Sequence, residues 1–199
     1  MLAGAWNTRL FTPQWLAEHV FQQRELQVEF PDRAGLPYRY IAENVRITPS
    51  ANQVVLSPLV LTDGALQEAE RQAVRILRTL VHTPVSAFGT NFGFAEEAPT
   101  ADALRLFSLG DSAELATAGY TIESTDIRRR LIYGDGDLNF TLSLVEGQVR
   151  TDFNFHQPVA SSAEAARLLD GTVLRNRDRA VALLQDAYNF DITAEVVDL

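Results

Sequence analysis

Alternation of apolar and polar positions is the clearest pattern in the second half of the chain. In the run DLNFTLSLVE, residues 137–146, an apolar series of Leu138, Phe140, Leu142 and Leu144 alternates with mostly polar positions. A period of two is typical of a strand that buries one face. We therefore predict a strand here, with a turn at GDGD before it and another at EG after it.

The same stretch, begun two residues earlier, carries side chains that a calcium-binding helix–loop–helix uses as ligands. Asp135, Asp137 and Asn139 occupy the first, third and fifth positions, and Ser143 and Glu146 occupy the ninth and twelfth. A calcium loop needs glycine at the sixth position, where this chain has phenylalanine, and a helix on each side. An extended strand would separate the first and twelfth residues by roughly 35 Å. We therefore predict no calcium site and no other metal site.

Two further runs, DIRRRLIYG at 126–134 and QVRTDFNF at 148–155, predict strands next to this one. In all three runs the apolar positions fall on one face, which we expect to pack against helices. The opposite face is polar, with Asn139, Thr141 and Ser143 on the middle strand. The candidate ligand-binding or partner-binding residues on this face are Arg128, Arg130, Arg150, Asp152, Asn154 and His156.

Three interpretations of this polar face are open. The first, which we prefer, is a solvated face with cross-strand arginine–aspartate pairs. The second is a binding surface for an anionic ligand or partner, and the third is a catalytic site. Catalysis would depend on Asp152 and His156, which lie four positions apart on a strand. That spacing corresponds to about 13 Å, which is too long for a direct hydrogen bond, so we assign no catalytic residue.

Helix starts are predicted from capping residues and from apolar positions at helical spacing. Asp63 is predicted to cap a long helix with an apolar stripe, and Ser161 with Glu164 forms the capping box Ser-x-x-Glu. A different pattern occupies residues 115–123, where the run LATAGYTIE predicts an additional strand.

An internal duplication is predicted from a spacing that occurs twice. Each of two Asp-Gly pairs is followed, ten positions after its aspartate, by Ala-Val and then by two more aliphatic residues, with an offset of 107 positions between the two sets. The predicted order of strand, short helix, several antiparallel strands and long helix also occurs twice. We therefore expect one compact domain built from two halves, residues 1–83 and 84–199.

This doubled order resembles the topology of the TATA-box-binding protein fold. The resemblance covers most of the chain and lies in the order of elements, not in residue motifs. It implies an α+β fold with a curved antiparallel sheet and helices packed on one face. Fold alone does not carry function, and DNA binding in that family requires a cationic surface that an acidic chain does not provide.

Composition excludes several kinds of chemistry. The 199 residues are 46% hydrophobic and 22% charged, which is ordinary for a globular protein. There is no cysteine, and all 17 basic residues are arginine, so thiolate, disulfide, lysine Schiff-base and Walker-type phosphate chemistry are excluded. Three scattered histidines do not form a zinc motif. No cofactor is predicted.

The formal net charge of −9 disfavours nucleic acid as a partner, and no apolar run is long enough to span a bilayer. We expect a cytoplasmic protein that lacks catalytic activity, although the sequence leaves enzymatic function open. The favoured function is a protein-binding or assembly module, adaptor-like or chaperone-like, with a protein partner or self-association. The alternative is a small-anion binder or an enzyme that uses the polar arginine, aspartate and histidine face.

Overall fold

The structure is a computed structural model that describes residues 1–31, 33, 36–191 and 193–194. Its strands are β1 (Leu2–Gly4), β2 (Gln27–Glu29), β3 (Arg39–Ala42), β4 (Val45–Pro49), β5 (Gln53–Pro58), β6 (Val85–Glu96), β7 (Ser124–Tyr133), β8 (Gly136–Val145), β9 (Gln148–Pro158) and β10 (Thr193–Ala194). Its helices are α1 (Pro13–Leu16), α2 (Asp63–Thr79), α3 (Ala101–Arg105), α4 (Ser112–Thr117), α5 (Ser162–Leu169) and α6 (Val173–Tyr188), with short helical turns η1 (Thr8–Leu10) and η2 (Ala17–Phe21).

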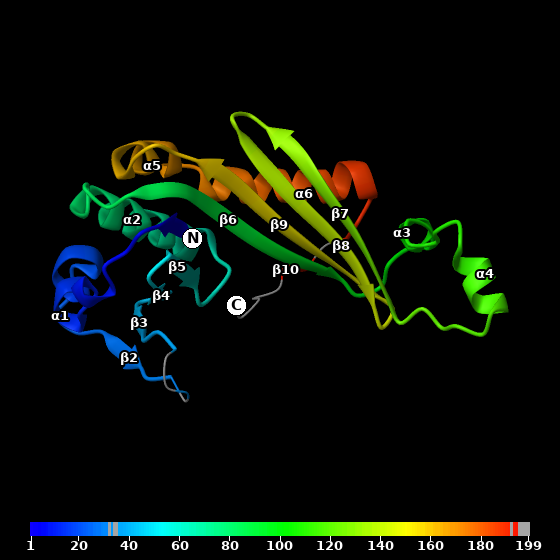
Figure 1. Cartoon of the computed structure of the whole chain (residues 1–199), viewed down its shortest axis with the longest axis horizontal. Coiled ribbons are helices and arrows are strands. Elements are labelled where there is room, and N and C mark those ends of the chain that lie inside the picture. Colours follow the sequence, from blue (N-terminus) through cyan, green and yellow to red (C-terminus); the bar gives the residue numbers. More distant parts are fainter. Residues whose placement is uncertain (32, 34–35, 192, 195–199) are drawn as a thin grey trace. The chain divides into compact units, whose positions relative to one another are not determined.

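The predicted α+β class with an antiparallel sheet is confirmed (Figure 1). The strands follow the order β2-β3-β4-β5-β1-β6-β9-β8-β7, and β10 pairs with β6. Within the described ranges, β2 and β7 therefore stand at the two ends of the strand order. Contacts divide the chain into two compact units, residues 1–90 with 156–176 and residues 91–155 with 177–199.

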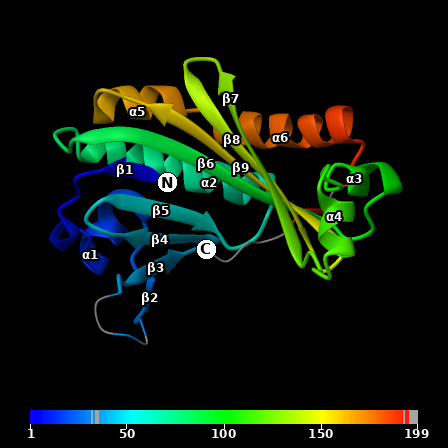
Figure 2. The same cartoon turned by 45° about the vertical axis from the view of Figure 1, so that its right-hand side comes forward.

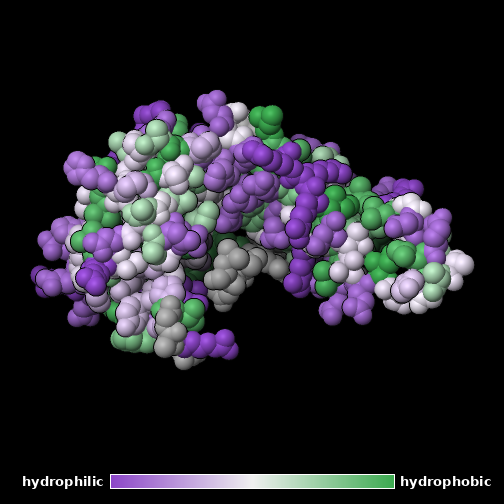
Figure 3. Space-filling view, in the orientation of Figure 1, coloured by the Kyte–Doolittle hydropathy of each residue, from purple (hydrophilic) through white to green (hydrophobic). Residues whose placement is uncertain are grey.

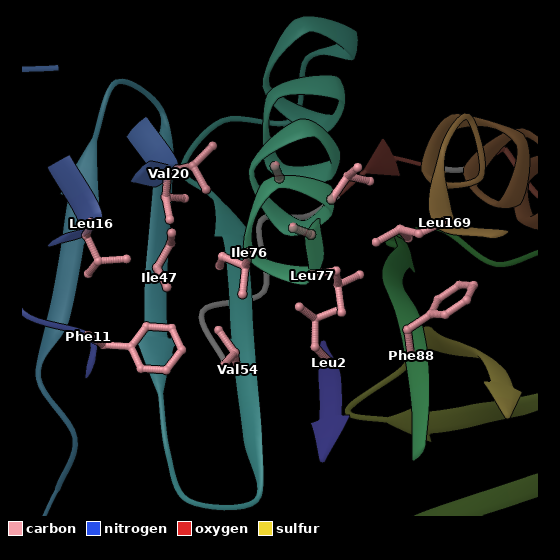
Figure 4. Close-up of a cluster of buried hydrophobic side chains, with 14 of the residues drawn as sticks. Leu2, Phe11, Leu16, Val20, Ile47, Val54, Ile76, Leu77, Phe88 and Leu169 are labelled. Carbon is pink, nitrogen blue, oxygen red and sulfur yellow. The ribbon is translucent and has the colours of Figure 1, made fainter. Parts of the chain in front are cut away.

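The first unit has its own core on one face of β4 and β5. Helix α2 packs on these strands, and α5 and η2 pack against α2. Figure 4 shows Ile47 and Val54 from the strands lying near Ile76 and Leu77 of the helix, and all four side chains are fully buried. The buried face of α2 is thus the apolar stripe that the helical spacing in the sequence predicted.

The second unit has a separate core, rich in aromatic residues. Helix α6 runs behind β8 and β9 in both Figure 1 and Figure 2. Phe140 of β8 and Phe153 of β9 have ring centroids 4.6 Å apart, and Leu184 of α6 is fully buried in the same cluster. Arg129 of β7 also reaches this side, where its Nη1 donates to the Tyr188 hydroxyl at 2.6 Å.

Helix starts agree with the predicted capping residues in one case and differ by one residue in another. The Ser161 hydroxyl accepts from the Glu164 backbone N–H at 3.2 Å, which confirms this half of the capping box. The long helix α2 is capped by Thr62, whose hydroxyl accepts from the Ala65 N–H, so the assignment of this role to Asp63 was wrong. Asp63 instead lies in the first turn, where its negative charge interacts favourably with the positive end of the helix dipole.

The strand predicted at 115–123 was also wrong. Residues Ser112–Thr117 form α4, and the residues that follow it have no regular structure before β7. The alternating positions of LATAGY are small or exposed, with only Leu115 partly buried, so no apolar face is available to pack as a sheet. Ala, Glu and Leu also have high helix propensity, which favours the observed short helix.

The first residues of α6 and the turn before it belong to the first unit, and their contact with α2 provides a test of packing there. The Glu70 carboxylate of α2 accepts from the backbone N–H groups of Gly171, at 2.8 Å, and Val173, at 2.7 Å. Val173 lies in the first turn of α6, where backbone N–H donors have no partner within the helix itself, and Gly171 lies in the turn just before it. We expect Glu70→Ala to lower the free energy of unfolding by about 1–2 kcal/mol in chemical denaturation. Glu18→Ala, at an exposed glutamate of η2, should change it by less than about 0.5 kcal/mol. Equal effects of the two substitutions would contradict this capping role.

Candidate functional site

Two short turns fix how the three polar strands align. Gly134 and Asp135 join β7 to β8, and Glu146 and Gly147 join β8 to β9. Gly134, Glu146 and Gly147 have φ values of 60°, 53° and 84°, as two-residue hairpin turns require. The resulting register sets Arg128 opposite Thr141 and Arg130 opposite Asn139.

The pleat of β8 separates buried from exposed side chains, as predicted. Leu138, Phe140 and Leu142 are buried on the α6 side, which leaves Asn139 and Thr141 on the other face. The strand predicted over this run is confirmed. The two ends of the calcium-like stretch lie in the turns at opposite ends of β8. Among the described residues, no group of three or more His, Cys, Asp or Glu side chains has the arrangement of a metal site.

Arg130 is held by a two-point interaction with Asp137. Its Nε donates to Oδ1 at 3.0 Å and its Nη2 to Oδ2 at 2.7 Å. The hydrogen bonds and the charge of Asp137 raise the pKa of Arg130. On the same strand, Arg128 Nη2 lies 3.5 Å from Asp126 Oδ2. Both arginines therefore have a carboxylate partner, and the guanidinium of Arg130 contacts both oxygens of Asp137.

Asp152 couples β9 electrostatically to β7. Partial desolvation raises the pKa of its carboxyl, the nearby charge of Asp126 raises it further, and Arg150 lowers it. Three arginines on this face, at 128, 130 and 150, are therefore matched by three aspartates, at 126, 137 and 152. The face is polar, as the hydrophilic surface over these strands in Figure 3 shows, but its charges balance.

A line of asparagine side chains crosses the adjacent strands. Asn139 Nδ2 of β8 donates to Asn154 Oδ1 of β9 at 3.0 Å. Asn154 Nδ2 in turn donates to Asn91 Oδ1 of β6. The Asn154 amide thus has both a donor and an acceptor partner within the protein, which reduces what it can offer to a ligand.

Five of the six predicted residues share this face of the second unit: Arg128, Arg130, Arg150, Asp152 and Asn154. His156 belongs to the first unit and is partly buried. The prediction omitted Asp126, Asp137 and Asn91, which complete the pairs. Alternation alone could have identified Asp126, which lies two positions from Arg128, and Asp137, which lies two positions from Asn139. Asn91 gave no such signal, since its position beside β9 depends on the strand order.

A shallow depression lies at the start of β7. It is lined by Ile122, Ser124, Thr125, Leu144 and, among others, Glu146. Its lining includes glutamates but no histidine or nucleophile paired with a base. This depression therefore does not provide a catalytic arrangement.

Comparisons with protein-family models, with curated proteins and with solved structures find no match for this chain. In the part of the chain that the structure describes, no helix combines the length and apolar character needed to cross a membrane.

The raised pKa of Asp152 predicts a pH dependence of stability. A carboxyl whose pKa is higher in the folded state than its ordinary value of 3.8 favours folding more when it is protonated. Its contribution to the free energy of unfolding is therefore lost as pH rises. The free energy of unfolding of the wild type, minus that of Asp152→Asn, should therefore fall as pH increases from about 3.8 and then level off. Denaturant titrations of both proteins between pH 3 and pH 7 measure this difference. A difference that increases with pH would show that the carboxylate is stabilised by the fold.

Proposed function

We propose that this chain is a non-enzymatic protein-binding or assembly module that binds through the edge of β7 that has no neighbouring strand among the described residues. The observation that carries the proposal is the position of β7 at the end of the strand order together with its exposed apolar residues. Ile132 is 90% exposed and the adjacent Leu131 is 37% exposed. A strand edge and an exposed aliphatic side chain offer hydrogen bonds and apolar area to the same partner.

The length of β7 supports a binding role for its edge. The strand has ten residues, whereas most strands have about five or six. An edge strand presents unpaired backbone N–H and C=O groups, and proteins commonly shorten or cover such edges to prevent unwanted pairing. The opposite end of the strand order is formed by β2, which has three residues. Of these two edges, β7 can therefore pair with the longer segment.

The alternative, a small-anion binder or an enzyme on the polar face, has weaker support. Each arginine of the face lies near an aspartate, so the face offers no surplus of positive charge. An anionic ligand would have to displace the two-point Asp137 interaction from Arg130. We further propose a cytoplasmic location and a protein partner instead of a nucleic acid. The acidic net charge of −9 is consistent with both.

We also propose that residues 1–83 and 84–199 are duplicated halves with a topology like that of the TATA-box-binding protein fold. The strand order supports this, because β2-β3-β4-β5-β1 is followed by β6-β9-β8-β7, the same sequence of strands reversed with one strand missing. Ala73 and Ala180, and likewise Leu77 and Leu184, are buried at the predicted offset of 107 positions. Failure of α2 with β3–β5 to superpose on α6 with β7–β9 in an experimental structure would refute the duplication.

Photocrosslinking locates the binding surface. Benzoylphenylalanine at position 132 should crosslink to protein in cells of the native host, because this exposed side chain lies at the proposed edge. The same probe at Leu104 of α3, which is 38% exposed, is the matched control and should give no specific product. A probe at Asn139 tests the polar face, and crosslinking there alone would move the site from the edge to that face.

The small-anion alternative gives a different result. It requires inorganic phosphate or a simple carboxylate to raise the melting temperature of the wild type but not of the Arg130→Ala, Arg150→Ala double variant. Such a result, combined with no crosslink at position 132, would replace the proposed function.

A further inference from the structure

The hairpin turn determines which backbone groups of β7 point away from the sheet. Its two-residue turn closes on Tyr133 and Gly136, which are paired in the ladder. In an antiparallel ladder, pairs that exchange hydrogen bonds alternate with pairs that do not, and the pair that closes a two-residue turn exchanges them. Counting back from Tyr133, the backbone N–H and C=O groups of Asp126, Arg128 and Arg130 therefore point away from β8.

We propose that the partner at this edge is a second copy of the chain. In this arrangement β7 pairs antiparallel with β7 of the second copy, about a twofold axis that passes beside Ile127. The outward groups of Asp126 then exchange hydrogen bonds with those of Arg128 of the second copy, and the reverse pair forms by symmetry. The inference rests on the proposed function, because it names the partner of the same edge.

Charge complementarity selects this register. With Ile127 on the axis, Asp126 faces Arg128 of the second copy twice, so two cross-strand ion pairs are added to the 3.5 Å Asp126–Arg128 pair within each chain. Thr125 faces Arg129 of the second copy, and Ser124 faces Arg130 of the second copy. No like charges face each other directly.

The neighbouring registers are unfavourable. An axis at Asp126 sets two aspartates face to face, and an axis at Arg128 or Arg129 sets two arginines face to face. Like charges directly opposite each other destabilise strand pairing. Of the four axis positions from 126 to 129, only Ile127 therefore avoids this repulsion and also forms ion pairs.

The same register gives Ile132, the most exposed apolar residue of β7, an apolar partner. Extending the pairing by two residues before β7 would set Ile122 opposite Ile132 of the second copy. These side chains are 46% and 90% exposed in the single chain. Directly opposed side chains have Cβ atoms about 5 Å apart, so each isoleucine would cover part of the other. Burial of both pairs would favour association by removing apolar area from water.

A charge exchange tests the proposal, with sedimentation equilibrium of the full chain as the measurement. The wild type should dimerise, and either Asp126→Arg or Arg128→Asp alone should weaken the dimer about tenfold or more, since two ion pairs become two repulsive pairs. The Asp126→Arg, Arg128→Asp double variant restores both pairs and should return the dissociation constant to within about threefold of wild type. Melting temperatures check that each variant is folded.

A single introduced cysteine tests the register. The chain contains no cysteine, so a disulfide in Ile127→Cys must join two copies. On the axis, this pair lacks direct hydrogen bonds and has Cα atoms about 4.5 Å apart, within disulfide range. Thr125→Cys, also partly buried, is the control, because its two thiols would be separated by four residues along the strands, roughly 13 Å. We expect a disulfide dimer in Ile127→Cys and little or none in Thr125→Cys.

Several results would overturn the proposal. A wild type that stays monomeric at several hundred micromolar would do so, as would a dimer that neither single charge change weakens. If the wild type is monomeric while a probe at position 132 crosslinks to a different protein, the second copy is the wrong partner but the proposed function stands. If neither dimer nor crosslink is found, the proposed function fails as well.

Discussion

Burial of one face of β8 and β9 is the constraint on which the second unit depends. Phe140, Leu142 and Phe153 are almost completely buried against α6 and neighbouring strands. Because side chains alternate across a strand, a slip of one residue would expose these three and bury charged or amide groups instead. Full burial of a large apolar side chain contributes roughly 1.5–3 kcal/mol, so such a slip would cost several times that amount. The two short turns require the same register, and local and long-range preferences therefore agree.

The polar face follows from that register without any separate cause. Once the apolar side chains are inward, Arg130 must project beside Asp137, and Asn139 must lie between Arg130 and Asn154. The pairs are exposed, so each contributes at most about 1 kcal/mol to folding. Their main effect is to neutralise the face, which leaves little charge to attract an anion. The same register directs the outward backbone groups of β7, and the most distinctive binding feature is consequently at the edge and not on the face.

The parts of the fold that depend on local pattern could be predicted from the sequence, and those that depend on strand order could not. The runs around Phe140 and Phe153 alternate large apolar residues with polar ones, so their strands and faces were evident. The run at 115–123 alternates mainly small residues, and alternation without substantial apolar area does not specify a strand. The Asp126 and Asp137 partners require the register of a hairpin, and the Asn91 contact requires β6 to lie beside β9. The position of β7 at an edge is still less local, because it depends on where all the other strands pair.

The three consecutive arginines at 128–130 explain how a long edge can be both exposed and selective. Like charges along an edge oppose pairing with another strand of the same charge, which is a common protection against aggregation. A uniform positive edge would oppose every self-pairing register in the same way. Asp126 breaks that uniformity at one position, so the register about Ile127 gains ion pairs without facing like charges, whereas each neighbouring register keeps at least one like-charge pair. Specificity arises from this difference between registers more than from the strength of any one pair, since each exposed pair is weak. A change that merely adds positive charge to the edge should therefore weaken association in every register, whereas an exchange of the two signs preserves the difference.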